Sequence, residues 1–105
     1  MKEHEWKKFK KLKDVCLDRF FERVLADANS IITTNTKTNR EKYYDLYKLI
    51  EDEDKRLATA FDGLSRNTAF MQLFLMHQMG LVEERELDEF ETETSSKIRS
   101  LGSEY

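Results

Sequence analysis

Apolar and polar residues follow one another with the period of an α-helix through most of this chain. Between residues 3 and 32, apolar positions recur at intervals of three and four, namely at Trp6, Phe9, Leu12, Cys16, Phe20, Val24, Ala28 and Ile31. This spacing is typical of an amphipathic helix. Similar patterns predict four helices in all, over approximately residues 3–32, 39–62, 66–79 and 83–101, and no segment has the pattern of a strand.

The boundaries between these segments carry residues that begin and end helices. Thr38 and Glu41 fit a capping box at the start of the second helix, and Ser65 fits the N-cap of the third. Gly80 fits the end of the third helix, with Leu81 placed for the hydrophobic contact of a Schellman motif. Residues 1–105 therefore predict one domain, an all-α antiparallel four-helix bundle with a long N-terminal helix and a central apolar third helix.

The segment from residue 67 to residue 82 contains no charged residue, although 37% of the whole chain is charged. On a helix, its large apolar side chains leave no wide polar stripe. Such a helix lies at the centre of a bundle or against another molecule, and it is shorter than the roughly 20 residues that span a bilayer. We therefore expect no membrane contact.

Unequal helix lengths indicate a second chain. At about 1.5 Å per residue the four helices would be roughly 44, 35, 21 and 26 Å long, so the first turns of the first helix would extend beyond the third and fourth. Trp6 and Phe9 would then have little cover within one chain. We expect a protein partner and self-association as a homodimer, with contacts through Trp6, Phe9, Phe70, Met71, Phe74 and Leu75.

Charge is distributed unevenly about a net charge of −3. Residues 1–13 contain six lysines and two glutamates, whereas residues 83–94 contain seven acidic residues and one arginine. Lysines at a helix N-terminus oppose the helix dipole, so another interaction is expected to recruit them. The candidate contacts to an anionic partner are Lys7, Lys8, Lys10 and Lys11. A solvated face or an acidic protein is favoured here over nucleic acid, and nucleic acid over a membrane surface.

One string of residues has the spacing of a known DNA-binding element. The matching residues are Ser65, Arg66, Asn67, Thr68, Leu73, Gly80, Leu81 and Val82. They resemble the DNA-binding part of GntR-type winged-helix repressors over about a quarter of the chain, which implies a recognition helix beginning at Ser65. The preceding turn is one residue longer than in that family, and the faces that would contact DNA are apolar. We therefore favour a capped core helix and keep nucleic-acid binding as the alternative.

Three tyrosines and one histidine are interpreted as packing residues. Tyr43 and Tyr47 lie one turn apart with Tyr44 beside them, and we expect core packing with the hydroxyls reaching solvent. An interface anchor is the alternative for this group. His77 lies inside the apolar helix, where we expect it to bond a backbone carbonyl rather than act as a ligand or base.

No arrangement of residues in the sequence indicates catalysis or metal binding. Asp14, Asp18 and Glu22 lie one helical turn apart but have no paired histidine, and the neighbouring Arg19 and Arg23 are expected to neutralise them. One cysteine and two histidines are too few for a zinc cage without carboxylates. We expect no enzymatic activity, no cofactor and no metal.

The sequence thus predicts a protein that acts by binding. A lone cysteine excludes an intrachain disulfide and no apolar leader is recognisable, so a cytoplasmic location is expected. The expected function is that of a small non-enzymatic interaction or regulatory protein that binds a protein partner and self-associates. The alternatives are a nucleic-acid-binding regulator and a helical protein that binds a hydrophobic ligand in a pocket lined by Phe70, Phe74, Met76 and His77.

Overall fold

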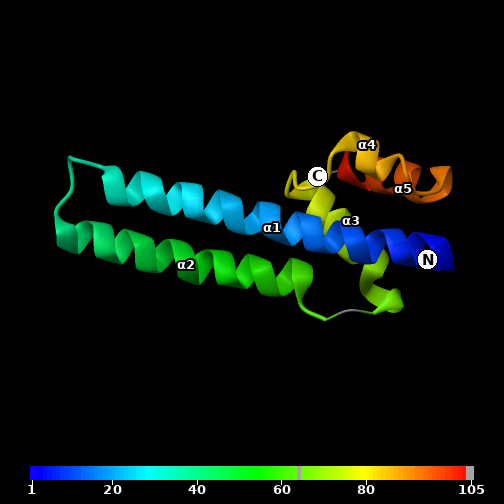
Figure 1. The fold of residues 1–105 in the computed structure, drawn as a ribbon, viewed down its shortest axis with the longest axis horizontal. Helices are drawn as coiled ribbons and strands as arrows, with labels where there is room; N and C mark the ends of the chain where they lie inside the picture. Colours follow the sequence, from blue (N-terminus) through cyan, green and yellow to red (C-terminus); the bar gives the residue numbers. More distant parts are fainter. Residues whose placement is uncertain (64, 104–105) are drawn as a thin grey trace.

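The computed structural model of the chain describes residues 1–63 and 65–103, and within these ranges it contains helices and no strand. The helices are α1 (Glu3–Thr33), α2 (Asn39–Phe61), α3 (Arg66–Gln78), α4 (Glu84–Leu87) and α5 (Thr92–Gly102) (Figure 1). The all-α prediction is confirmed for this part of the chain. None of these helices combines the length and the apolar character that crossing a bilayer requires.

α1 and α2 form a long antiparallel hairpin (Figure 1). α1 continues unbroken for 31 residues, as its apolar spacing predicts. At the start of α2, the Thr38 hydroxyl accepts the N–H of Glu41 at 3.2 Å and the Glu41 carboxylate accepts the N–H of Thr38 at 3.0 Å. The predicted capping box is therefore present, and its hydrogen bonds hold the pKa of Glu41 below the ordinary value.

α3 begins and ends at the residues that the sequence indicates. The Ser65 hydroxyl accepts the N–H of Asn67 at 3.1 Å. At the other end, the N–H of Leu81 donates to the carbonyl of Met76 at 3.0 Å and Gly80 has a φ of 71°. These are the bonds and the left-handed residue of a Schellman motif, which is thus confirmed. Between its caps, α3 packs against α1, α2 and α5.

The helix predicted over residues 83–101 is two helices, separated by an irregular segment at residues 88–91. Leu87 at the end of α4, Phe90 within the irregular segment and Ile98 in α5 are all buried. The chain changes direction between them, which lets all three side chains reach the core. The N–H of Glu91 donates to the Glu5 carboxylate at 3.3 Å, so α5 starts against the first turn of α1.

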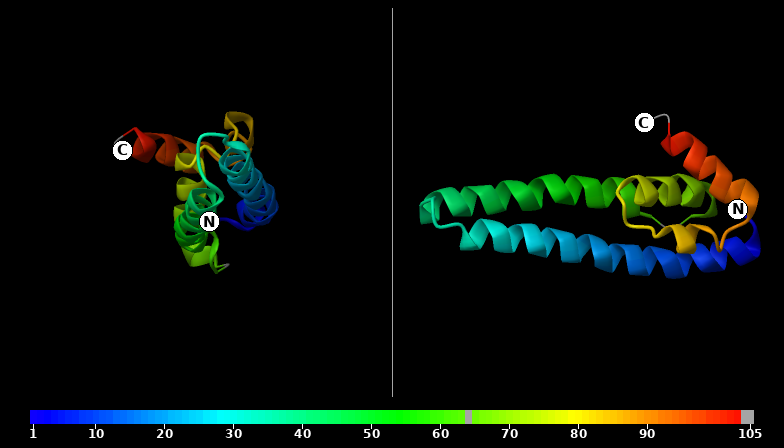
Figure 2. Two further views of the ribbon diagram at one scale, coloured as in Figure 1. Left: turned by 90° about the vertical axis from the view of Figure 1, so that its left-hand side faces the viewer. Right: turned by 90° about the horizontal axis from the view of Figure 1, so that it is seen from above.

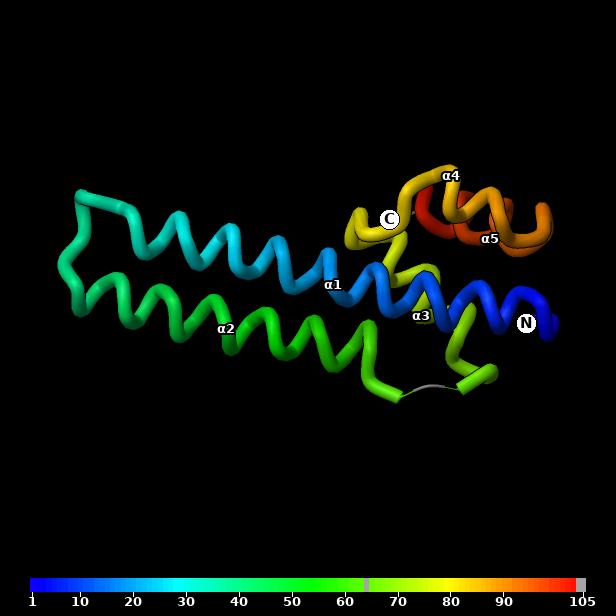
Figure 3. The backbone as a smooth tube through the Cα atoms, in the orientation of Figure 1, coloured from blue at the N-terminus to red at the C-terminus, as the bar shows by residue number. Residues whose placement is uncertain are grey.

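The structure is elongated because only one end of the hairpin is covered. Its principal extents are 52 × 25 × 21 Å, and its radius of gyration is 16.5 Å, compared with about 13 Å for a compact domain of this size. Figures 2 and 3 show that α3, α4 and α5 all lie beside the end formed by the start of α1 and the end of α2. We call this the proximal end. The remainder, residues 21–54, projects from it as two helices and is called the arm.

The hydrophobic core occupies the proximal end. In α2 only the last two residues, Ala60 and Phe61, are buried, whereas α1 buries residues from its first turns onward. Trp6 is 9% exposed and Phe9 is fully buried. The expectation that these two residues lack intramolecular cover is therefore wrong. α1 does extend beyond α3, but at its C-terminal end, because α3, α4 and α5 fold back over its N-terminal half.

Candidate interaction surface

The arm carries a continuous set of large hydrophobic side chains that the chain itself does not cover. We call this set the apolar face, and it consists of Phe21, Leu25, Ile32, Tyr43, Tyr47 and Ile50, each 42 to 67% exposed. Its members recur at helical intervals, Phe21 and Leu25 in α1 and Tyr43, Tyr47 and Ile50 in α2. Residues at these spacings share one side of a helix.

The residues from the two helices lie on the same side of the hairpin. Phe21 and Leu25 of α1 line a groove together with Ile50 and Asp54 of α2, and the buried Phe20 and Val24 form its floor. The groove has a volume of about 220 Å³. The apolar face is therefore one surface that crosses from α1 to α2, rather than two stripes on opposite sides.

The other side of the hairpin is polar. A second groove there is lined by Arg23 and Asp27 of α1 and by Arg56 of α2, and the turn after α3 closes it at Met79 and Leu81. The hairpin is thus amphipathic as a unit, with charged residues on the side of the α3–α4 turn. If both sides of the arm only faced water, large hydrophobic side chains would not be needed on the side opposite these charges.

Charges of opposite sign border the two ends of the apolar face. At the proximal end lie Asp18 and Glu22 of α1 and Glu51 and Asp54 of α2, and no ion pair joins any of these four to another described residue. At the tip, Arg40 stands one turn before Tyr43 with its guanidinium 5.9 Å from the centre of the Tyr44 ring. Four carboxylates therefore border one end of the face, and one arginine without an ion pair to a described residue borders the other.

These carboxylates have no ion-pair partner in the described part of the chain because the arginines of α1 bind groups in the segment that follows α3. Arg19 binds both oxygens of Glu86, with Nη1–Oε1 and Nη2–Oε2 distances of 2.6 and 3.1 Å. Arg23 donates to the carbonyls of Met79 and Gly80 at the end of α3. The prediction that these arginines neutralise Asp14, Asp18 and Glu22 is therefore wrong. Their electrostatic role is to hold the turn between α3 and α4.

Of the six contact residues expected from the sequence, most are buried or packed against other residues of the same chain. Trp6, Phe9 and Phe74 are buried. Phe70 lines a pocket at the proximal end, and Leu75 lines a groove between α2 and α3. Met71 alone among the six is more than half exposed. The structure does not bring the six together on one open surface.

The three tyrosines at the start of α2 belong to an exposed surface that the sequence analysis did not predict. Tyr43, Tyr44 and Tyr47 are all more than half exposed, so the expectation of core packing is wrong for them. The alternative, an interface anchor, remains open. The sequence does signal that some surface of the hairpin stays uncovered, because a third helix of 13 residues spans little more than half of the 23-residue α2. It does not say which end that surface occupies.

The lysines near the N-terminus face the acidic C-terminal region of the same chain. Lys8 donates to the backbone carbonyl of Glu89 at 2.6 Å, and Lys2 lies 3.1 Å from the Glu91 carboxylate. Lys10 stacks over the Trp6 ring at 5.5 Å. Lys7 and Lys11 are exposed. Some of the N-terminal lysines, from which an external anionic partner was expected, therefore bind the acidic C-terminal region of their own chain.

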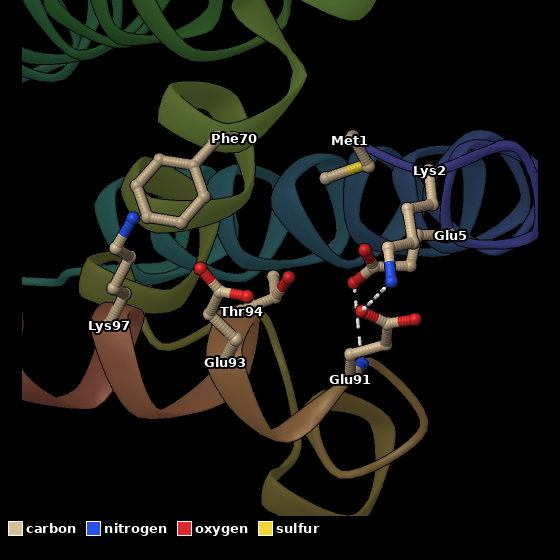
Figure 4. Close-up of a pocket in the computed structure, with 8 residues that line it drawn as sticks. All are labelled: Met1, Lys2, Glu5, Phe70, Glu91, Glu93, Thr94 and Lys97. Atoms are coloured by element: carbon tan, nitrogen blue, oxygen red, sulfur yellow. Dashed lines mark hydrogen bonds and ion pairs between the residues drawn. The ribbon is translucent and has the colours of Figure 1, made fainter.

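A pocket of about 440 Å³ lies where these segments meet (Figure 4). Figure 4 shows Phe70 and Lys97 on one side of it and the linked Lys2, Glu5 and Glu91 on the other. Glu5 is buried and accepts the N–H of Glu91. Among the described residues, no histidine, cysteine or serine lines the pocket, and Thr94 supplies its one side-chain hydroxyl. Lys2 and Glu5 both bind Glu91 at the start of α5, so these contacts fix α5 against α1.

The element resembling a repressor helix is engaged within the chain. Arg66 pairs with Glu3 at 2.7 Å and stacks over the Trp6 ring at 5.5 Å. Ser65 serves as the N-cap of α3. A winged helix also needs a β-hairpin after the recognition helix, and residues 79–103 form α4 and α5 without a strand. The geometry of a winged helix is therefore not found in the described residues.

His77 has an acidic partner rather than a backbone carbonyl. Its Nε2 lies 2.9 Å from Glu84, which also binds Arg99, and these contacts hold the pKa of Glu84 below the ordinary value. Of the four residues expected to line a ligand pocket, Met76 is fully buried and the His77 ring contacts Glu84 of α4. No cluster of three potential metal ligands occurs among residues 1–63 and 65–103.

The comparisons with known proteins give no information on function, so the inference about function rests on the arm and its apolar face. Compared with models of protein families, with curated proteins and with solved structures, the chain matches none of them.

Proposed function

We propose that this chain is a non-enzymatic helical interaction protein that binds a protein partner through the apolar face of its arm. The observation that carries the proposal is the set of six large hydrophobic side chains left open on one side of α1 and α2. An exposed apolar surface of this kind, bordered by charges, is typical of a protein-binding site. Two tyrosines within it are of the residue type most enriched at binding hot spots.

The division of the molecule into two parts supports the same role. The proximal end buries the core and holds its connections with charged hydrogen bonds, as between Arg19 and Glu86. The arm buries little and presents side chains outward from two regular helices. A rigid base with a projecting, amphipathic hairpin is suited to presenting a surface to another helical protein, which would lay its own apolar face against it.

The proposal includes a cytoplasmic location and the absence of catalysis. The thiol of Cys16 is buried and burial, its largest influence, raises its pKa to about 12, so it is not an activated nucleophile. The carboxylates of Asp14, Asp18 and Glu22 form no hydrogen bond with a histidine or a hydroxyl group of residues 1–63 and 65–103. These features favour binding over chemistry.

Photo-crosslinking in the cells that make this protein tests the proposal. A photoreactive amino acid replaces Leu25 in one variant and Ala26 in a matched control, since both positions are exposed but Ala26 lies on the side of α1 away from the groove. Adducts of defined mass at position 25 and none at position 26 are the expected result. Equal labelling at the two positions, or no adduct at position 25, would overturn the proposal.

A further inference from the structure

We infer that the partner on the apolar face is a second copy of this chain, docked with its arm antiparallel to the first so that the two arms form a four-helix bundle. This inference rests on the proposed function and names the occupant of its surface. This bundle differs from the one predicted from the sequence, which consisted of four helices of a single chain. Here α1 packs on α1 and α2 on α2 of the other copy.

The size of the apolar face agrees with a dimer contact. From exposures of 42 to 67%, and the roughly 150–250 Å² that a large aromatic side chain can bury, the six side chains expose on the order of 700 Å². A specific interface of standard size buries about 800 Å² on each partner, and a typical monomer leaves open no patch larger than about 300–600 Å². Twofold symmetry lets the same face serve both partners.

The charge at the two ends of the face selects the direction of docking. A twofold axis along the arm would place the arms parallel, with Glu22 and Asp54 of one copy near the same acidic end of the other. A twofold axis across the arm reverses one copy, so that the acidic end of each arm lies over the tip of the other. Like charges face one another in the first arrangement and opposite charges in the second.

The antiparallel arrangement gives a definite register. The midpoint of the face lies near Leu25 in α1 and near Tyr47 in α2, so each of these residues approaches its own equivalent in the other copy. With Tyr47 at the centre, Asp54 of one copy lies opposite Arg40 of the other, because the two positions are seven residues to either side. Both Asp54 and Arg40 lack an ion pair with any described residue of their own chain.

Sedimentation of the full chain tests self-association through this face. The wild-type chain is expected to be a dimer at about 0.1 mM, and Leu25→Glu to be monomeric, because it buries a like-charge pair at the twofold axis. Ala26→Glu adds the same charge one residue away and should stay dimeric. Circular dichroism of each variant confirms that it is folded. A wild-type chain that is monomeric, or an Ala26→Glu variant as weakened as Leu25→Glu, overturns the inference.

A charge exchange tests the antiparallel direction. Arg40→Asp and Asp54→Arg should each weaken the dimer by about tenfold or more, and the double variant should recover most of the loss. Within one chain these positions are fourteen residues apart on α2, roughly 21 Å, so they cannot compensate each other there. Absence of recovery in the double variant overturns the antiparallel register. A monomeric wild-type chain that still crosslinks from position 25 to another protein overturns the dimer and leaves the proposed function standing.

Discussion

Arg19 and Glu86 form a bidentate ion pair that joins the middle of α1 to α4, with Nη1–Oε1 and Nη2–Oε2 distances of 2.6 and 3.1 Å. The same guanidinium donates to the carbonyl of Leu81 at 2.8 Å. α4 has only four residues, too few to be stable by itself, so these bonds and the burial of Leu87 hold it in place. The side chain of Glu86 is 13% exposed, which makes it a strong contact rather than a surface pair.

Glu86→Gln is therefore expected to lower the free energy of unfolding by about 1.5–3 kcal/mol, because the charged, two-point contact of the partly buried Arg19 is lost. Arg19 keeps the Leu81 carbonyl at 2.8 Å and Glu83 at 3.5 Å. Urea unfolding measures the change. Asp52→Asn is the matched control, since Asp52 lies 3.9 Å from Lys48 at an exposed site and should cost no more than about 0.5 kcal/mol. Equal losses in the two variants would contradict the role given to Arg19.

The same pair predicts a dependence of stability on pH. The hydrogen bond from Arg19, as the largest influence, lowers the pKa of Glu86 below its usual 4.5. A carboxyl whose pKa is lower in the folded state stabilises the fold fully above the unfolded value, and this stabilisation is lost as pH falls through the folded value. The stability difference between wild type and Glu86→Gln should thus be constant from neutral pH to about pH 5 and shrink below pH 4.5. A difference that grows on acidification would refute this assignment.

Cys16 should resist thiol reagents in the folded chain. Its side chain is fully buried, its Sγ lies 3.3 Å from the carbonyl of Leu81, and burial raises its pKa to about 12. At about pH 8 it is almost wholly protonated, and only the thiolate reacts. Labelling by Ellman's reagent is expected to follow the rate of unfolding. Val15→Cys in a Cys16→Ala background places a thiol at a 42% exposed neighbouring position and should react at once.

Gly80→Ala should destabilise the turn that follows α3. Gly80 has a φ of 71°, and an added Cβ would meet only Arg23 nitrogens at 3.6 and 3.7 Å, which is ordinary contact. The cost is therefore that of the left-handed backbone, about 1–2 kcal/mol. Gly80→Asn should cost less, because asparagine adopts this conformation more readily. Thermal unfolding compares the two variants, and an equal loss in both would point to steric contact with Arg23 instead.

The local features of the fold were predictable because each depends on residues close in sequence. The apolar spacing of α1, the capping box at Thr38 and the Schellman motif at Gly80 involve partners no more than five residues apart. The break after α4 was missed, since residues 83–101 keep a helical apolar pattern across it. What breaks the helix is tertiary: Glu91 must reach Glu5 at the far end of the sequence.

The candidate surface was the part that the sequence could not locate. Helix lengths alone indicate that α1 is longer than the helices that pack on it, but they do not say which end of α1 is left uncovered. That depends on where α3 and α5 pack, and contacts such as Arg66 over Trp6 decide it. Trp6, the most hydrophobic residue near the N-terminus, was therefore expected at an interface and lies in the core instead.

Tyr47 lies at the centre of the apolar face and should contribute more to binding than to folding. It is 61% exposed, so Tyr47→Ala is expected to change the free energy of unfolding of a monomeric background, such as Leu25→Glu, by no more than about 0.5 kcal/mol. In the otherwise wild-type chain the same substitution should weaken association by about 2 kcal/mol, as truncation of a central aromatic anchor does. Sedimentation equilibrium gives the association free energy.

Tyr44→Ala is the matched control for this prediction. Tyr44 is 56% exposed and lies about 100° around α2 from Tyr43, with its ring edge-on to that of Tyr43 at 5.4 Å and beneath the Arg40 guanidinium. Its truncation removes an aromatic side chain of the same size from the edge of the face, so association should weaken by less than about 1 kcal/mol. If Tyr44→Ala weakens association as much as Tyr47→Ala, the contact lies on the outer edge of α2. The apolar face between α1 and α2 would then not be the surface that the partner covers.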